Sequence, residues 1–296
     1  MASTEKWLED YLNYLEIEKN RSPKTRENYS RYLKEFLSFA KVKSPEAITE
    51  NIVRSFRVSL SRKNLKKITQ NYYVIAIRNF LKYLIKRDLK VLAPDKIELP
   101  KIPRRQIEIL EYKDLERLLS APGGEDLRAL RDRAILETFF STGLRLSELC
   151  SLDRYLDWSR GEITVRGKGE KLRVVFISDS AKVAIKKYLD KRSDPDPSLF
   201  ISLSKAKAPK VLGRITPRAV ERLVNFYSRK AGIVGKVTPH QLRHQFATDL
   251  LMNGADLRAV QEMLGHSSIS TTQIYTHLTN KELKEIHTTF HARRRK

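Results

Sequence analysis

Tyr275 lies in the stretch GHSSISTTQIYTH, residues 265–277, where its phenol is a possible nucleophile. The same stretch holds His266 and a run of hydroxyl side chains. Most tyrosines are nonetheless buried aromatics, and this chain has 12 of them. Because a side-chain nucleophile needs activation by its surroundings, Tyr275 is a candidate only if other residues can build a site around it.

A second stretch, STGLRLSELC, places a charged residue where burial is expected. Arg145 lies between two leucines at the predicted start of a helix. A buried guanidinium is unfavourable unless it pairs with a carboxylate or a phosphate. Glu148 follows three residues later on the same helical face, where it can orient Arg145.

The stretch TPHQLRHQFATDLL repeats this spacing. His240 and Arg243 share one face of a helix that Pro239 is expected to begin, whereas His244 and Phe246 are expected to point elsewhere. Taken alone, each of these motifs is at least as well explained by a surface arginine or a core histidine with its hydrogen bonds satisfied.

Considered together, the two arginines and the histidines predict a site for a phosphate that gains negative charge during a reaction. Lys168 adds a third kind of cation, at the tip of a predicted hairpin between Gly167 and Gly169. Guanidinium groups grip phosphate oxygens in pairs, and a lysine or histidine can protonate a leaving alkoxide.

The sequence motifs also bear on cofactors. There is no carboxylate cluster for two metal ions, no GxxxxGK[ST] phosphate loop and no CxxC…HxxxH zinc spacing. We therefore expect neither a cofactor nor a metal. Phosphoryl chemistry without either needs a side-chain nucleophile, and Tyr275 is the candidate.

The charge of the chain predicts its partner. Lys and Arg number 58 against 35 Asp and Glu, a net charge of +23. The excess is spread along the chain, because residues 1–105 carry 24 basic and 12 acidic side chains and the remainder carries 34 and 23. Residues 51–87 hold ten basic side chains and no acid. A polyanion, and above all a nucleic acid, is the expected partner, and a merely soluble basic protein is the alternative.

Periodicity predicts a helical N-terminal part. In residues 25–41 the apolar side chains recur at helical spacing, and Thr25 is expected to cap this helix. A second helix is expected from Thr69 to Arg87. Pro94, Pro100 and Pro103 then predict an extended linker. The predicted division is a helical domain at 1–93, a linker at 94–106 and a second domain at 107–296.

The second part is predicted to be mainly helical with a small sheet. One helix should end at Gly143, and another should begin at Thr216 and Pro217. Between them, alternating apolar residues predict the two strands of a β-hairpin. The apolar residues that alternate with polar ones are Ile163 and Val165 in the first strand and Leu172, Val174 and Phe176 in the second.

Composition also predicts the compartment. The single cysteine, Cys150, cannot form an intramolecular disulfide, which suits a reducing cytoplasm. The chain has no apolar run of 18 residues and its N-terminus is charged, so neither a membrane span nor a signal peptide is expected. We therefore expect a cytoplasmic protein.

The motifs resemble those of the tyrosine recombinases of the phage integrase family, most closely of the Xer type. The matching stretches are TGLRLSEL, VRGKGEKLR, TPHQLRHQFATDLL, LGHSSISTTQIYTH and, more weakly, RSPKTRENY. They span nearly the whole chain in the family's order. The resemblance implies a SAM-like helical core-binding domain followed by a mixed α/β catalytic domain.

The resemblance implies a role for each motif residue. Arg145 and Arg243 would bind the scissile phosphate, with Glu148 supporting Arg145 and His266 donating a hydrogen bond. Lys168 would protonate the leaving 5′-oxygen.

His240 would act as the acid–base group and Tyr275 would attack the phosphorus, giving a 3′-phosphotyrosyl bond. The implied assembly is a tetramer on double-stranded DNA, made of one recombinase or of two different ones. Its reaction would pass through a Holliday junction.

Alternatives remain at this stage. Chromosome-dimer resolution is favoured over a mobile-element integrase or excisionase, over a relaxase of the type IB topoisomerase kind and over an inactive DNA-binding relative. Gln245 stands where family members usually have Ser or Thr, which is expected to alter a local hydrogen bond. Residues 278–296 would form a helix that docks on a neighbouring subunit, and the alternative is a frayed basic end that binds the DNA backbone.

Overall fold

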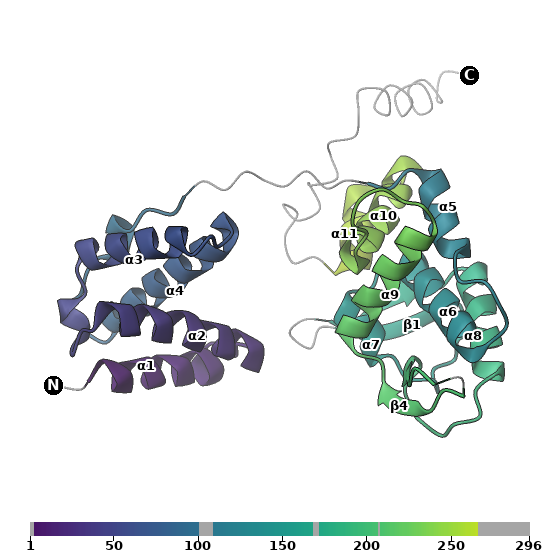
Figure 1. The fold of residues 1–296 in the computed structure, drawn as a ribbon, viewed down its shortest axis with the longest axis horizontal. Helices are drawn as coiled ribbons and strands as arrows, with labels where there is room; N and C mark the ends of the chain where they lie inside the picture. Colours follow the sequence, from purple (N-terminus) through teal and green to yellow (C-terminus); the bar gives the residue numbers. More distant parts are fainter. Residues whose placement is uncertain (1–2, 101–108, 168–171, 207, 266–296) are drawn as a thin grey trace, which may run out of the picture. The chain divides into compact units, whose positions relative to one another are not determined.

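The computed structural model describes residues 3–100, 109–167, 172–206 and 208–265. Lys168, His266, Tyr275 and the predicted docking segment 278–296 lie outside the described residues. The chain forms two compact units, residues 1–105 and 106–296 (Figure 1). Across the described part, no helix is both long enough and apolar enough to span a membrane.

The N-terminal unit is a bundle of helices around an aromatic-rich core. Its elements are α1 (Thr4–Asn13), which runs on into a π-helical turn, η1 (Tyr14–Glu18), then α2 (Pro23–Ala40), η2 (Pro45–Ala47), α3 (Glu50–Arg62), α4 (Lys67–Lys86) and η3 (Pro94–Lys96). Leu33 and Phe36 of α2 are fully buried against Phe56 and Phe80, as their helical spacing predicts.

The start of α2 differs from the sequence prediction. Ser22, not Thr25, caps the helix, because its Oγ accepts the Thr25 N–H at 3.3 Å and Pro23 occupies the first helical position. Proline suits that position, since its missing N–H would have no partner there. Thr25 is therefore already inside the first turn. The next predicted helix, α4, begins two residues earlier than expected.

The first residues of the predicted linker are packed rather than extended. Pro94–Lys96 form a 3₁₀ turn, and Ile97 is buried in the core of the N-terminal unit. Arg78 secures this turn by donating to the Ile97 carbonyl at 2.5 Å and pairing with Asp95 at 3.0 Å. The packed part of the N-terminal unit therefore extends to Ile97, with Pro94 and Ile97 buried and Asp95 and Lys96 exposed.

The second unit is mainly helical with two small sheets. Its helices are α5 (Tyr112–Ser120), α6 (Leu127–Thr142), α7 (Leu146–Ser151), α8 (Asp179–Asp190), α9 (Pro217–Lys230), α10 (Pro239–Met252) and α11 (Leu257–Leu264). Antiparallel pairs join β1 (Glu162–Arg166) to β2 (Leu172–Phe176) and β3 (Ile201–Leu203) to β4 (Val211–Arg214). The predicted fold class is confirmed.

Helix α6 is the centre of this unit. Its residues Ala134, Ile135, Leu136 and Phe139 are all fully buried, so neighbours cover several of its faces. Helices α8 and α10 pack against it, while α11 packs on α10 through Val260 and Leu264. Helices α10 and α11 lie together at one end of the unit, and β4 lies at the other (Figure 1).

The two strands form where the hairpin was predicted, and the alternating apolar residues of the second strand face outward. Val165 pairs with Arg173, and Ile163 pairs with Val175. Directly paired residues point to the same side of a sheet. Because Ile163 and Val165 are buried, Arg173 and Val175 face inward as well. The alternating apolar residues of this strand, Leu172, Val174 and Phe176, are exposed on the opposite face.

Candidate active site

The loop between α6 and α7 places Arg145 at the start of α7. Gly143 ends α6 with a left-handed backbone, φ +57°. A Cβ at this position would lie 2.3 Å from Phe246 on α10, so only glycine fits the close approach. Arg145 then caps α7, and its backbone N–H donates to Glu148 Oε2 at 2.8 Å.

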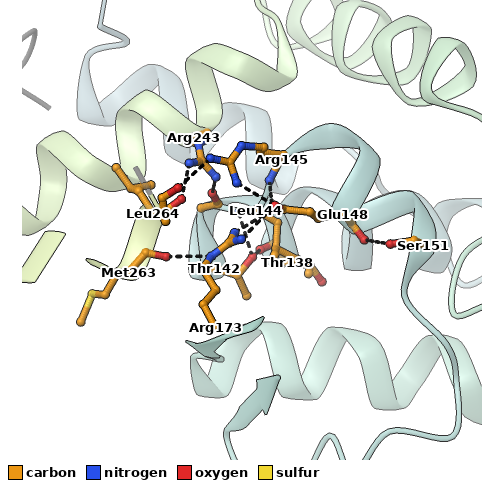
Figure 2. A network of polar contacts seen from close by, with 12 residues as sticks. Thr138, Thr142, Leu144, Arg145, Glu148, Ser151, Arg173, Arg243, Met263 and Leu264 are labelled. Carbon is orange, nitrogen blue, oxygen red and sulfur yellow. Dashed lines mark hydrogen bonds and ion pairs between the residues drawn. The ribbon is translucent and has the colours of Figure 1, made fainter. Parts of the chain in front are cut away.

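Glu148 is the centre of a buried ionic network (Figure 2). It is 5% exposed. Its Oε1 accepts from Arg145 Nη1 and Arg173 Nη1, both at 2.8 Å, and its Oε2 accepts from Arg173 Nη2 at 2.6 Å. Burial by itself raises the pKa of this carboxyl, but the hydrogen bonds from Arg173 and Arg145 outweigh it and lower the pKa to about 2. Glu148 is thus a carboxylate at any physiological pH.

Arg173 was not among the residues selected from the sequence. Its guanidinium is nearly buried, and it forms a fork with both oxygens of Glu148. The signal that could have found it is strand pairing. If Ile163 and Val165 face the core and Arg166 pairs with Leu172, Arg173 lies opposite Val165 and therefore faces inward.

Helix α10 presents Arg243 to the same place. Thr238 and Gln241 cap the helix reciprocally, and Pro239 begins it as predicted. Arg243 is 3% exposed and donates to the Gly143 carbonyl and to the Leu264 carbonyl, each at 2.6 Å. One arginine thereby joins the end of α6 to the end of α11.

His240 lies one turn before Arg243 and is exposed to solvent. Partial desolvation and then the positive charge of Arg243 lower the pKa of its imidazole. The expectation that His244 points elsewhere was wrong, because its ring centre lies 4.2 Å from that of His240. Residues four apart on a helix share a face, so the two histidines stack edge to face.

Three arginines bind three consecutive carbonyl groups at the C-terminal end of α11. Arg173 Nε donates to Met263 at 3.1 Å, Arg243 Nη2 to Leu264 at 2.6 Å and Arg145 Nη2 to Gly265 at 2.9 Å. The last carbonyls of a helix lack partners within it and carry partial negative charge, so cations there are favourable. The next residue in the chain is His266. The three contacts therefore fix the point from which the segment with His266 and Tyr275 departs.

The network keeps a net positive charge. Arg145 and Arg173 pair with one carboxylate, Glu148, and Arg145 remains 32% exposed. Arg243 adds a third positive charge at the same end of α11. Within the described residues, two of the five guanidinium N–H groups of Arg145 are used, one by Glu148 and one by Gly265. The site can therefore accept an anion, and no cluster of His, Cys, Asp or Glu in the described part could hold a metal.

Comparison with known proteins agrees with this arrangement. Residues 108–282 match the model of the phage integrase family, and residues 8–88 match the SAM-like N-terminal domain of phage integrases. The chain belongs to the phage integrase family. It is a tyrosine recombinase of the Xer type, an enzyme that breaks and rejoins DNA by transesterification.

The recombinase is similar to its relatives over almost its full length. It is 39% identical to the tyrosine recombinase XerC of Thermodesulfovibrio yellowstonii, covering 98% of each chain, and 38% identical to XerC of Escherichia coli O139:H28, covering 97% of this chain and 96% of the relative. Among solved structures, it resembles XerA recombinase with a TM-score of 0.55, at 33% identity and 98% and 99% coverage. XerH bound to its difH substrate gives a TM-score of 0.69, at 25% identity and 95% and 83% coverage.

Gln245 anchors another segment of the recombinase to α10. This residue is buried, and its Oε1 accepts the backbone N–H of Leu110 at 3.1 Å. A serine or threonine side chain is shorter and would not reach the same donor without a shift of the backbone. Gln245 therefore attaches the first described residues of the catalytic unit to α10, on the helix that carries Arg243.

Proposed function

We propose that this recombinase exchanges strands between two copies of a specific duplex DNA site, with Tyr275 as the nucleophile. One observation carries the proposal: Arg145 and Arg243, from separate elements, both reach the C-terminal end of α11, directly before His266 and the segment that leads to Tyr275. A phosphate held by these arginines would be within reach of that segment.

Phosphate binding is the first step. Arg145 and Arg243 donate to the non-bridging oxygens of the scissile phosphate, with His266 as a further donor. Charge-assisted hydrogen bonds of this kind strengthen as charge builds on the oxygens, so they favour the pentacovalent transition state over the ground state. Glu148 contributes by holding the Arg145 side chain at the start of α7.

Cleavage is the second step. The Tyr275 oxygen attacks phosphorus and forms a 3′-phosphotyrosyl bond while the bond to the 5′-oxygen breaks. The phenol proton passes to His240, whose lowered pKa keeps its imidazole neutral near pH 7. Lys168, at the hairpin tip, gives a proton to the leaving 5′-oxygen. A 5′-hydroxyl from the second duplex then reverses the step, and each phosphodiester lost is replaced by one formed.

Complete recombination takes two such strand exchanges, and the Holliday junction is the intermediate between them. Four recombinase subunits would hold the two DNA sites throughout. We propose a tetramer, of this chain alone or with a second recombinase, that resolves chromosome dimers in the cytoplasm. The full-length similarity to XerC proteins supports this task. The exposed Arg54, Arg62 and Lys66 in the acid-free stretch 51–87 support DNA binding by the N-terminal unit.

Covalent trapping tests the proposal. Duplexes that the protein binds are selected from a random pool and nicked near the centre, so that the cleaved end diffuses away. A denaturant-resistant adduct on the 3′-phosphate is expected from the wild type and not from Tyr275→Phe, which retains DNA binding. An adduct that persists in Tyr275→Phe would exclude Tyr275 as the nucleophile. Relaxation of plasmids that lack the selected site would favour a topoisomerase activity instead.

A further inference from the structure

Arg173 occupies the centre of the site without a role in the reaction described above. It lies on β2, shortly after the hairpin tip that carries Lys168, and its side chain is 8% exposed. Its two terminal nitrogens bind the two oxygens of Glu148, and its Nε binds the Met263 carbonyl. Three guanidinium nitrogens are thus all engaged by protein groups, which leaves Arg173 poorly placed to grip DNA itself.

The charges at Glu148 explain why a second arginine is needed. If Arg145 were the only cation beside this buried carboxylate, the pair would be neutral, and Arg145 would bring little net charge to a phosphate. Arg173 forms the two-point fork with Glu148, whereas Arg145 contributes one guanidinium bond and one backbone bond. Forked arginine–carboxylate pairs are the stronger kind. Arg173 therefore neutralises Glu148, and the charge of Arg145 stays available.

The geometry adds a mechanical connection. Arg173 joins β2 to Glu148 on α7 and to Met263 at the end of α11, while Arg145 joins Glu148 to Gly265, two residues further on (Figure 2). These contacts form a closed ring through three elements. The hairpin, the start of α7 and the departure point of the segment with His266 and Tyr275 are thereby held in one arrangement.

We infer that Arg173 is a positioning residue for strand cleavage, which neutralises Glu148 and fixes the end of α11 so that Arg145 meets the scissile phosphate with its charge uncompensated. The inference rests on the proposed function, in which Arg145 binds that phosphate. It predicts that Arg173 affects the cleavage rate far more than DNA affinity, and that this effect depends on the charge of Glu148.

A double-mutant cycle tests the inference. Single-turnover cleavage rates and DNA dissociation constants are measured on the nicked duplex for the wild type, Arg173→Met, Glu148→Gln and the double variant. Arg173→Met should slow cleavage by roughly 100-fold, in the range for loss of one transition-state contact, and change the dissociation constant by less than about threefold. In the Glu148→Gln background the same change should slow cleavage by less than about tenfold, since no charge remains to be neutralised.

Arg160→Met is the matched control. It removes one positive charge just before β1, where Arg160 forms an exposed pair with Asp157 at 3.1 Å. Exposed pairs contribute little, so cleavage should stay within about twofold of the wild type. If Arg173→Met does not fold, Arg173→Lys is compared in both backgrounds, because lysine keeps the charge and loses the fork.

The outcomes are distinct. Equal slowing by the Arg173 change in both backgrounds, or wild-type cleavage by folded Arg173→Met, would overturn the inference and leave the proposed function intact. Absence of a Tyr275-dependent adduct from the wild type would instead overturn the proposed function, and the role of Arg173 with it.

Discussion

The catalytic unit holds two buried carboxylates that are paired with arginine, and they differ in what surrounds them. Asp132 on α6 accepts two bonds from Arg131 through one oxygen and one bond from the Tyr227 hydroxyl, 3.1 Å away, through the other. Glu148 accepts from two arginines. Both carboxylates are 5% exposed. Burial raises the pKa of Asp132 despite Arg131, whereas the pKa of Glu148 falls to about 2.

The difference lies in net charge. The Asp132 cluster contains one cation and one anion, and the remaining contact of Arg131 goes to the Ile201 carbonyl, so the cluster is satisfied within the protein. The Glu148 network contains three arginines and one carboxylate. A neutral, closed cluster serves structure, while an excess of buried cations is stable only if an anion or helix carbonyls balance it. This contrast separates a structural ion pair from a phosphate site.

The largest expected contrast is between removing Arg145 from the Glu148 network and removing Arg131 from the Asp132 cluster. Arg145→Ala should slow single-turnover cleavage by roughly 10²–10³-fold with little loss of DNA affinity, because the contact strengthens in the transition state. Arg131→Ala should lower the free energy of unfolding by about 3–5 kcal/mol, because it leaves a buried charge unpaired. Its folded fraction should cleave at the wild-type rate. Denaturant titration and the trapping assay measure the two effects, and a cleavage defect in folded Arg131→Ala would break the comparison.

A substitution at Gly143 tests whether the arginine network depends on the left-handed backbone that ends α6. Gly143→Ala should lower the free energy of unfolding by roughly 2–4 kcal/mol, since alanine is strained at φ +57° and its Cβ would displace Phe246. Cleavage should fall as well, because the Gly143 carbonyl holds Arg243.

Gly123→Ala is the control for this substitution. The added Cβ meets nothing within 4 Å there, so thermal unfolding and cleavage should be unchanged. Wild-type stability in Gly143→Ala would mean that α10 moves away without cost.

Tyr227→Phe is a smaller change to the Asp132 cluster than Arg131→Ala. It removes the hydroxyl that donates to Asp132 and should lower the free energy of unfolding by about 1–3 kcal/mol, the range for a buried acceptor left unsatisfied. Cleavage by the folded protein should not change. Urea titration measures the free energy of unfolding, and the trapping assay measures cleavage. Slower cleavage by fully folded Tyr227→Phe would show that the Asp132 cluster also affects the Glu148 network.

The last prediction concerns the free energy of unfolding at acid pH, and no pH effect from Glu148 is expected near neutral pH. The pKa of Glu148 is lower in the folded state than in the unfolded state, so its contribution to stability is present above the usual glutamate value and is lost as pH falls toward 2. The pKa of Asp132 is raised, which gives the opposite slope. Between about pH 4.5 and 2, Glu148→Gln should therefore lose less stability than the wild type. A parallel loss in both proteins would contradict the lowered pKa.

Local signals in the sequence were reliable where a single turn of chain decides the outcome. Thr216 caps α9, Pro217 begins it and Gly143 ends α6, as predicted. The Arg145–Glu148 contact was also predictable, because both partners lie within one helical turn. The helix at Pro23 shows the limit of such signals, since Ser22 and Thr25 are both good caps and the position of the proline decides between them.

Contacts between distant segments were the ones missed. Alternation along β2 allows either face to be buried, and the face with Leu172, Val174 and Phe176 is the exposed one. The pairing with β1 turns Arg173 inward, and burial of that guanidinium is tolerated because Glu148 is there to receive it. Neither strand carries that information alone.

The sequence by itself determined the family, the helical character of both units, the predicted reaction and the motif residues, because these follow from residue types at short spacing. Only the tertiary structure decided that Arg173 neutralises Glu148, that His244 stacks on His240 and that three arginines hold consecutive carbonyls of α11. The physical reason is that a buried charge is stable only beside its partners, and those partners come from parts of the chain that folding alone brings together.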